Sequence, residues 1–416
     1  MLAEIIAVGS ELLTPYRQDT NSLFLTEQLN NVGVTVVFKT IVGDRKAHLV
    51  QAVRYALERV DIVCVMGGLG PTEDDLTREA VAEALGVRLR RNGDLLTALY
   101  KRFAERRISM PANNSKQADL IDGAEALPNA NGTAPGQWID TTYGEQGHRK
   151  LVLLLPGPPN ELKPMFLTAC MPRLQQALPP RHIARRVLKI AMLPESEVDA
   201  RLAPIYTRFT DVETTILAHA GEVQLHMLCA KTILEVAEGR VNELASRIEE
   251  EMEDAIFSTQ GESLEQIVLY YLGIRGATVA VAESCTGGLL SQRITSVSGS
   301  SRSFLGGAVV YSDALKADFA EVPEDLIEDN GAVSREVAEA LARGIRRRTQ
   351  ATLGVGITGI AGPAGGSESK PVGLVYIGLD DGKEINVSEH RFRGDRERIR
   401  SLASQQALDM LRRKLM

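Results

Sequence analysis

The chain has 416 residues, a length that favours two or three domains over a single core. Its formal net charge of −7 argues against a predominantly basic, nucleic-acid-binding surface. The four cysteines are scattered and form no CxxC pair, so neither a disulfide framework nor a zinc knuckle is expected. There is no signal-peptide pattern and no apolar run long enough for a membrane span, so the expected location is cytoplasmic.

Near the N-terminus, strand-like apolar runs alternate with helix-like segments. "EIIAVG", "VTVVFKTIV" and "DIVCVMGG" have the composition of strands, and "DTNSLFLTEQLNNVG" and "KAHLVQAVRYALERV" between them have helical spacing. "KLVLLLPGPP", near residue 150, predicts a further buried strand. This alternation predicts a mostly parallel sheet covered by helices.

The pattern changes near residue 172 and returns near residue 258. "ARRVLKIAML", "EVQLHMLCAK" and the charged "EGRVNELASRIEEEMEDAIF" indicate a small α+β module. "ATVAVAES", "FLGGAVVYS", "ATLGVGITG" and "PVGLVYIGLD" then predict strands separated by helices. The predicted fold class is α/β, with two three-layer domains of mostly parallel sheet at 1–171 and 258–416, joined by the α+β module at 172–257.

The stretch "AESCTGG" places Ser284 where a strand ends and a helix begins. The carboxyl ends of parallel strands are where ligands bind in α/β sheets. The backbone N–H groups of Thr286, Gly287 and Gly288 are candidates to hold an oxyanion or a phosphate. Serine needs a base, and His390, the one histidine in this region, lies in a charged segment outside these motifs. The structural alternative is a plain strand–helix turn.

Two further motifs accompany the serine. "VVYSDALKADF" puts Tyr311 at a strand end and Lys316 five residues later, and a desolvated lysine can act as a base, with the tyrosine orienting it. The loop "GITGIAGPAGGSESKPVG" contains Gly359 and Gly362, which allow the backbone to approach a ligand closely. Cys285 is a rival nucleophile without an evident base, and its alternative role is that of a small core residue.

A glycine-rich turn also follows a buried strand near the N-terminus. "VMGGLGPTEDDLTREA" places Thr72, Asp74 and Asp75 at a helix start. Glycines at a helix N-terminus suit a phosphate, and adjacent carboxylates suit a divalent ion that carries one. The structural alternative is an N-cap with an acidic first turn, which the helix dipole favours.

The C-terminal motifs "AESCTGG", "GAVVYSDALK", "GITGIAGPAGGSESKPVG" and "FRGDRERIR" together resemble the C-terminal domain of the CinA family, also found alone as the PncC nicotinamide mononucleotide deamidase. The resemblance implies hydrolysis of nicotinamide mononucleotide to nicotinic acid mononucleotide and ammonia, with no cofactor. It assigns catalysis to Ser284, Tyr311 and Lys316.

Two features of this region remain open. Arg396 and Arg400 in "GDRERIR" are candidate ligands of the substrate phosphate, with a solvated helix face as the alternative. Asp313 stands where related sequences often carry Asn. If it faces the ligand, its charge weakens the binding of phosphate-bearing substrates; if it caps the helix, the change is harmless.

The N-terminal motifs "GSELL", "DTN", "GGLGPTEDD", "PANNSKQA", "NGTAPG" and "PGPPNE" resemble the MoaB/MogA-like, molybdopterin-binding-type domain of CinA proteins. The resemblance implies an ADP-ribose pyrophosphatase that needs a divalent metal such as Mg²⁺, with K⁺ as an optional second ion, and that yields AMP and ribose 5-phosphate. The candidate metal ligands are Asp74 and Asp75, and Glu11, Asp19 and Glu161 are further polar residues near strand ends. The ligand-binding residues that it implies are Gly68, Gly70, Thr72, Asp75, Asn114, Lys116 and Gln117.

The middle module resembles the KH-like module of the same family. It contains no GXXG loop, and its acidic "EEEMED" helix would repel phosphates, so nucleic acid is not the expected partner. We expect a spacer or dimer-forming element and a homodimer without a membrane partner. The whole chain is thus expected to be a bifunctional enzyme of pyridine-nucleotide salvage. The alternative is a binding or regulatory protein of competence and DNA damage, whose N-terminal domain binds a pterin or nucleotide without turnover.

Overall fold

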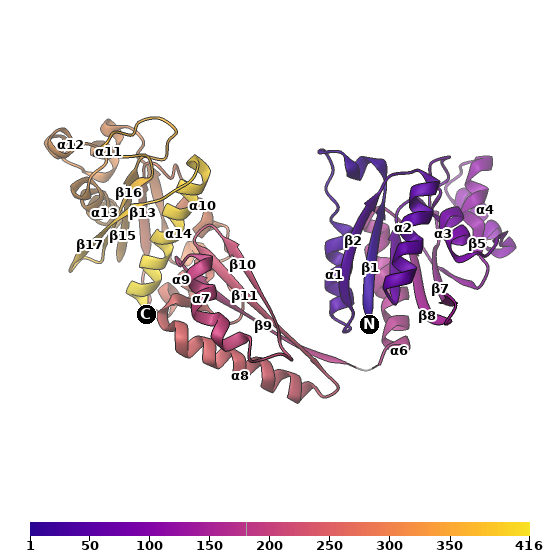
Figure 1. The fold of residues 1–416 in the computed structure, drawn as a ribbon. Helices are drawn as coiled ribbons and strands as arrows, with labels where there is room; N and C mark the ends of the chain where they lie inside the picture. The colour runs from indigo at the N-terminus through magenta and orange to yellow at the C-terminus, as the bar shows by residue number, and fades with distance from the viewer. Residues whose placement is uncertain (180) are drawn as a thin grey trace. The chain divides into compact units, whose positions relative to one another are not determined.

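The computed structural model describes residues 1–179 and 181–416 (Figure 1). No helix in this part of the chain is long and apolar enough to cross a membrane. The chain divides into two compact units, which are described separately. They comprise Met1–Ile183 with Ala230–Leu234, and Ala184–Cys229 with Glu235–Met416.

The first unit is built on a six-stranded sheet with the order β2-β1-β3-β8-β7-β6. Strands β2, β1, β3 and β8 are parallel, and β7 runs antiparallel to both β8 and β6. All five residues of β3 are buried, as expected for a central strand covered on both faces. The strands are β1 (Leu2–Val8), β2 (Thr35–Val42), β3 (Ile62–Met66), β6 (Ala124–Leu127), β7 (Gly136–Tyr143) and β8 (His148–Leu155).

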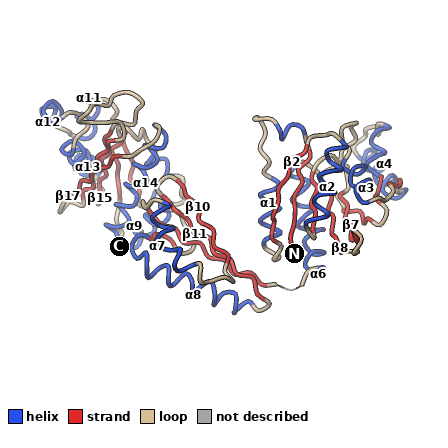
Figure 2. The backbone as a smooth tube through the Cα atoms, viewed as in Figure 1, coloured by secondary structure: helices blue, strands red, loops and turns tan. Residues whose placement is uncertain are grey.

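Helices cover both faces of this sheet and complete a three-layer arrangement (Figure 2). Buried side chains of α1, α5 and α6 pack on one face, and those of α2 and α3 pack on the other. A two-stranded sheet of β4 (Leu89–Arg91) and β5 (Asp119–Ile121) lies apart from the main sheet. The helices are η1 (Ser10–Leu13), α1 (Asn21–Asn30), α2 (Lys46–Arg59), α3 (Thr77–Leu85), α4 (Gly93–Glu105), η2 (Ala112–Ala118), α5 (Pro159–Met165), η3 (Phe166–Cys170) and α6 (Met171–Ala177).

The second unit begins with the α+β module, a four-stranded sheet in the order β10-β11-β9-β12. Burial alternates along β11, which is the pattern of a strand with one face on the core. Helix α8 packs its buried residues, which recur at helical spacing, against this core. The elements are β9 (His182–Ala191), α7 (Glu195–Tyr206), β10 (Glu213–His219), β11 (Glu222–Lys231), α8 (Leu234–Met252), η4 (Glu253–Ala255) and β12 (Ile256–Ser258).

The C-terminal part of this unit is a five-stranded sheet in the order β14-β13-β15-β16-β17. Buried side chains of α9, α10 and α14 cover one face, and those of α11 and α13 cover the other. The predicted α/β class is therefore confirmed. The strands are β13 (Val279–Glu283), β14 (Phe304–Val309), β15 (Leu353–Gly359), β16 (Leu374–Asp380) and β17 (Ile385–Arg391), and the helices are α9 (Leu264–Arg275), α10 (Leu289–Thr295), η5 (Ser300–Arg302), α11 (Asp313–Ala320), α12 (Glu324–Asn330), α13 (Arg335–Thr349) and α14 (Arg396–Leu415).

The parallel part of this sheet is limited to β14, β13 and β15, whereas β16 and β17 add antiparallel strands. Only Asp381–Glu384 joins β16 to β17, which is too short for the crossover that a parallel pair needs. Strand β17 was not among the predicted strands, because its polar sequence "INVSEHR" lacks the apolar run on which the prediction relied.

The α+β module contacts the C-terminal sheet's last helix. The side chain of Gln405 on α14 donates to the carbonyl of Gly221 (3.4 Å), in the turn between β10 and β11. The buried Arg412 donates to the carbonyl of Asp254 (2.7 Å). The turn "HAGE" is thus packed against α14.

Candidate functional site

Ser284 is the first residue after β13, at the carboxyl edge of the C-terminal sheet. Its N–H donates to the carbonyl of Ile357 on β15 (3.0 Å), and its own carbonyl accepts from the N–H of Gly287 (3.0 Å). Gly287 and Gly288 have φ angles of 59° and 90°, in the region that favours glycine. These contacts hold Ser284 in a tight turn before α10, and it is 8% exposed.

The three backbone donors expected in this turn are not equivalent. The N–H of Gly287 is bonded to the carbonyl of Ser284, so in this conformation it is not a donor for an oxyanion. The N–H groups of Thr286 and Gly288 have no protein acceptor within 1–179 and 181–416. Two of the three candidates therefore remain.

Glu283, the last residue of β13, is fully buried and accepts hydrogen bonds from backbone N–H groups at the start of α10. Its carboxylate accepts from the N–H of Leu290 (3.0 Å) and from the N–H and hydroxyl of Ser291 (2.8 and 2.7 Å). Sequence reasoning missed this role, although Glu283 lies only six residues before the first residue of the helix. The dipole of α10 is thus already matched by a protein carboxylate.

Tyr311 and Lys316 come from the neighbouring strand and the helix after it. Glu283 pairs with Val309, so the residues that follow β13 and β14 lie beside each other at one sheet edge. Lys316 is 2% exposed, and its ammonium donates to Asp313 (2.9 Å) and to the carbonyl of Tyr311 (3.4 Å). The phenol of Tyr311 is exposed. A buried lysine and an accessible phenol therefore lie at the same edge as the serine.

Asp313 does not cap the helix. Helix α11 is capped by Ser312, whose hydroxyl accepts from the N–H of Leu315 (3.3 Å). Asp313 follows the cap and pairs with Lys316. Its charge is directed to the candidate base rather than to the helix end.

Arg396 and Arg400 both donate hydrogen bonds to protein groups at the site. Arg396 donates to the carbonyl of Gly362 (2.9 Å) and to the hydroxyl of Tyr311 (3.0 Å). Arg400 donates twice to the carbonyl of Thr286 (3.1 and 2.7 Å). The start of α14 thus connects the serine turn, the tyrosine and the glycine-rich loop. In this arrangement the two guanidinium groups organise the site, and their role as phosphate ligands stays a prediction.

Cys285 and His390 do not have the surroundings of catalytic residues. Burial raises the pKa of the Cys285 thiol to about 12, so the thiol stays protonated near neutral pH and is a poor nucleophile. His390 lies on β17 and stacks on Phe392, with ring centroids 5.2 Å apart. Burial lowers the pKa of His390, which leaves it neutral.

The N-terminal glycine turn is closed by its own side chains. Asp75 accepts from the N–H and the hydroxyl of Thr72 (2.9 and 2.5 Å). A Cβ atom at Gly70 would collide with the Asp75 carboxylate, and one at Gly68 would collide with the hydroxyl of Thr77. Glycine is therefore needed at both positions for the turn to approach these side chains.

A buried arginine lies behind this turn. Arg78, on α3, is 1% exposed and donates to the carbonyls of Leu69 (2.8 Å) and Gly70 (3.1 Å). Burial lowers the pKa of Arg78, and nearby carboxylates oppose that effect. Sequence reasoning missed Arg78, because an arginine in a helix is usually expected on the surface. It supplies positive charge beneath the glycine-rich turn.

The "NNSKQ" residues contact the same turn. Lys116 donates to the carbonyls of Thr72 and Asp75, so its ammonium braces the turn. Asn114 donates to Gln117 (3.1 Å), and both are buried. Of these residues only Gln117 lines the adjacent cavity.

That cavity, which we call the acidic cavity, has a volume of about 340 Å³ and lies at the carboxyl ends of β1, β3 and β8. Glycines that follow each of these three strands form part of its wall, and none of its described lining residues is a lysine or an arginine. Its carboxylates come from Glu11, Asp44, Asp74, Asp75 and Glu161.

The donor set suits a hard divalent cation, because carboxylate oxygens are its preferred ligands. No cluster of three or more His, Cys, Asp or Glu side chains poised to hold a metal occurs in the described residues. The Asp75 carboxylate also accepts hydrogen bonds from Thr72. A cation here would therefore take one or two carboxylates and complete its coordination with phosphate oxygens and water.

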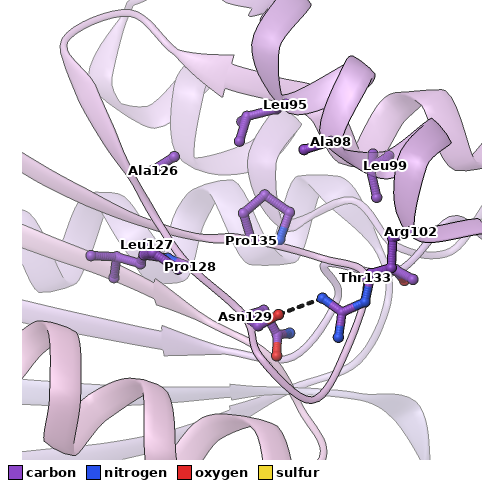
Figure 3. Close-up of a pocket in the computed structure, with 10 residues that line it drawn as sticks. All are labelled: Leu95, Ala98, Leu99, Arg102, Ala126, Leu127, Pro128, Asn129, Thr133 and Pro135. Atoms are coloured by element: carbon purple, nitrogen blue, oxygen red, sulfur yellow. Dashed lines mark hydrogen bonds between the residues drawn. The ribbon is translucent and has the colours of Figure 1, made fainter. Parts of the chain in front are cut away.

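Two more cavities adjoin the acidic cavity. A polar cavity of about 200 Å³ shares Val8, Glu11, Gly157 and Pro158 with it. An apolar cavity of about 330 Å³, between α4 and the loop before β7, shares Thr133 (Figure 3). Apolar carbon dominates the walls of this third cavity, and the lining residue Arg102 donates to the carbonyl of Asn129 (2.5 Å).

The fold and these sites define the class of the protein. It is an α/β protein with two candidate sites at the carboxyl ends of parallel strands, one centred on a serine and a buried lysine and the other on an acidic cavity. Three family models match it in order: a probable molybdopterin binding domain (4–176), a damage-inducible protein CinA KH domain (185–258) and a CinA C-terminal domain (261–415).

CinA-like proteins are similar to this chain over its entire length. The one from Acidobacterium capsulatum is 64% identical and the one from Koribacter versatilis is 60% identical, each over 100% of both chains. The one from Solibacter usitatus is 46% identical over 100% of this chain and 98% of its own. The chain belongs to the CinA family.

Solved structures resemble parts of the chain. The competence/damage inducible protein CihA from Agrobacterium tumefaciens is 37% identical and covers 36% of this chain and 93% of its own, with a TM-score of 0.35. A CinA protein from Thermoplasma acidophilum is 33% identical and covers 42% and 99%, with a TM-score of 0.38.

Proposed function

We propose that the chain is a bifunctional hydrolase of pyridine-nucleotide salvage. Its C-terminal site hydrolyses nicotinamide mononucleotide to nicotinic acid mononucleotide and ammonia. The observation that carries this proposal is the meeting of Ser284, Tyr311 and Lys316 at one sheet edge, because a serine nucleophile needs a nearby base and no histidine lies in these motifs.

In this reaction the hydroxyl of Ser284 attacks the amide carbon while the amine form of Lys316 takes its proton. The N–H groups of Thr286 and Gly288 are free to stabilise the oxyanion. Lys316 then gives the proton to the departing ammonia, and water hydrolyses the acyl-serine. Arg396 donates a hydrogen bond to the phenol of Tyr311. Tyr311 then orients the substrate or relays the proton. No cofactor takes part in these steps.

The test is ammonia release from nicotinamide mononucleotide by the purified chain and by Ser284→Ala. We expect the substitution to lower kcat by about 10³-fold or more, because it removes the attacking atom. Cys285→Ala is the matched control at the next position and should retain activity. Equal activity of Ser284→Ala and the parent would move the nucleophile elsewhere. Inactivity of the folded parent would favour a binding role or another amide substrate.

For the N-terminal site we propose metal-dependent hydrolysis of ADP-ribose to AMP and ribose 5-phosphate. The support is the acidic cavity, whose described lining residues include five carboxylates and no lysine or arginine, so a divalent cation would offset their repulsion of a diphosphate. The cation, with K⁺ as an optional second ion, would polarise the phosphate oxygens. Gly68 and Gly70 let the backbone approach the phosphates, and Arg78 adds positive charge from below.

AMP release from ADP-ribose in the presence of Mg²⁺ tests this second activity. Tight binding of a pterin or nucleotide without turnover would instead support a binding module, in a protein of competence or DNA-damage regulation. The expected homodimer is a separate proposal, which light scattering of the purified chain would test.

A further inference from the structure

Helix α10, which follows the serine turn, is joined to α14 at two places. At its start, Arg400 of α14 donates twice to the carbonyl of Thr286 (3.1 and 2.7 Å). At its end, Arg293 donates to the hydroxyl of Ser404 (2.9 Å) and to the amide oxygen of Gln405 (2.5 Å), both on α14. Because two separated contacts fix both the position and the direction of a short helix, α14 sets where the serine turn lies.

Gln405 extends this contact to the α+β module. It is 3% exposed, and while its amide oxygen accepts from Arg293, its amide N–H donates to the carbonyl of Gly221 (3.4 Å). Gly221 lies in the turn between β10 and β11, which we call the hairpin turn. The same carbonyl accepts from the N–H of Met192 (2.9 Å), which follows β9, so it is fixed within the module. One buried side chain therefore links the module to α10.

The hairpin turn also packs tightly against this side chain. Gly221 has a φ angle of 75°, and a Cβ atom there would lie 2.9 Å from Cγ of Gln405 and 3.0 Å from Sδ of Met192. Only a glycine permits so close an approach. Since a close-packed contact transmits displacement, a shift of the hairpin turn toward α14 must move Gln405.

We propose that the hairpin turn of the α+β module is a positioning element of the amidase site. Gln405 is the positioning residue, because it links the carbonyl of Gly221 to Arg293 and so fixes α10 and the serine turn. This inference rests on the proposed amide hydrolysis. A displacement of about 1 Å at a nucleophile slows the chemical step strongly. Since Ser284 acts in that step, loss of the link should lower kcat and leave KM nearly unchanged.

The first test separates the two hydrogen bonds of Gln405. Gln405→Met removes both and keeps most of the volume, so kcat for nicotinamide mononucleotide should fall about tenfold, with KM within about twofold. Gln405→Glu keeps an acceptor for Arg293 but loses the donor to Gly221, and kcat should fall about threefold. Gln406→Met, at the next position, is the matched control and should behave as the parent. Parent-like kinetics of either Gln405 variant would overturn the proposal.

The second test reaches the same contact from the module side. Gly221→Ala pushes a Cβ atom against Gln405 and should lower kcat by a similar factor. Gly261→Ala also places alanine at a positive φ, but the atom nearest its new Cβ is 3.9 Å away, so it controls for backbone strain. The double variant of Gly221→Ala and Gln405→Met should lose no more than the weaker single variant, because both act through one contact. Losses that multiply would show independent effects and overturn the proposal.

Hydrogen exchange tests the link without any activity. The N–H groups of Ser284 and Gly287 are hydrogen-bonded, so their exchange reports how firmly the serine turn is held. In Gln405→Met, exchange in the serine turn should rise about tenfold while exchange in β16 stays the same. This selective rise in a chain that does not hydrolyse nicotinamide mononucleotide would support the link and reject only the amidase. An equal rise in β16 would show a general loss of stability and overturn the proposal, as would no rise.

Discussion

The two sites of this chain lie at equivalent places in two α/β sheets and differ in how their polar groups are used. In the C-terminal site, Arg396 and Arg400 bond protein groups and Lys316 pairs with Asp313. In the N-terminal site, carboxylates face a cavity without a lining cation. In the first site these charged side chains contact protein groups, whereas in the second the carboxylates meet no cationic side chain among the described lining residues. An amide hydrolase fits the first, and a metal-dependent reaction on a diphosphate fits the second.

The sharpest way to separate the two sites is to remove the buried lysine. Lys316→Met keeps much of the side-chain volume and removes the base, so NMN hydrolysis should fall by about 10³-fold. ADP-ribose hydrolysis in the same preparation is the internal control and should not change. A Lys316→Met chain that still released ammonia at the parent's rate would rule out the serine–lysine pair.

Chelation should produce the opposite pattern. EDTA should lower ADP-ribose hydrolysis by about 100-fold or more, because the carboxylates of the acidic cavity then repel the diphosphate without a bound cation to offset them. Ammonia release from NMN should continue at the same rate in the same tube. Loss of both activities, or of neither, would contradict the contrast between the two sites.

The buried carboxylate under the serine turn provides a test of stability. Glu283→Gln keeps one acceptor but sets an amide N–H₂ against backbone donors, so we expect a loss of about 2 kcal/mol in the free energy of unfolding. Chemical denaturation followed by circular dichroism would measure it. Glu336→Gln, an exposed residue in the first turn of α13, makes the same change away from the turn and serves as the comparison. An unchanged midpoint would mean that α10 does not depend on this carboxylate.

The arginine that contacts the tyrosine should have a smaller effect. Arg396→Ala removes charge-assisted hydrogen bonds to Tyr311 and Gly362, and kcat for NMN should fall by about tenfold. If Arg396 binds the substrate phosphate instead, KM should rise while kcat stays the same. Steady-state kinetics distinguishes the two roles.

The smallest effect is expected at Cys285. With the pKa of its thiol at about 12, roughly 10⁻⁴ of it is thiolate at pH 8, so iodoacetamide should modify it only slowly in the folded chain. The modification rate should rise with pH, since only the thiolate reacts. Mass spectrometry of the labelled peptide would follow this, with the denatured chain as reference. Rapid labelling at pH 8 would contradict the buried environment.

Local sequence patterns predicted most of the elements that hold the two sites. The apolar runs ending at Met66 and Glu283 and the glycines that follow them are strand-to-turn transitions in the structure. The polar strand β17 was missed, because an edge strand with charged residues lacks an apolar signal. Arg78 was missed for a related reason, since burial of a charged residue depends on partners that sequence spacing does not show.

The sequence alone determined which residues stand at strand ends, because hydrophobic periodicity and glycine placement are properties of short segments. Only the tertiary structure decided what those residues contact. Arg396 meets Tyr311 across 85 positions, and Asn21 meets Gly157 across 136. Such pairs form where the sheet brings distant strand ends to one edge.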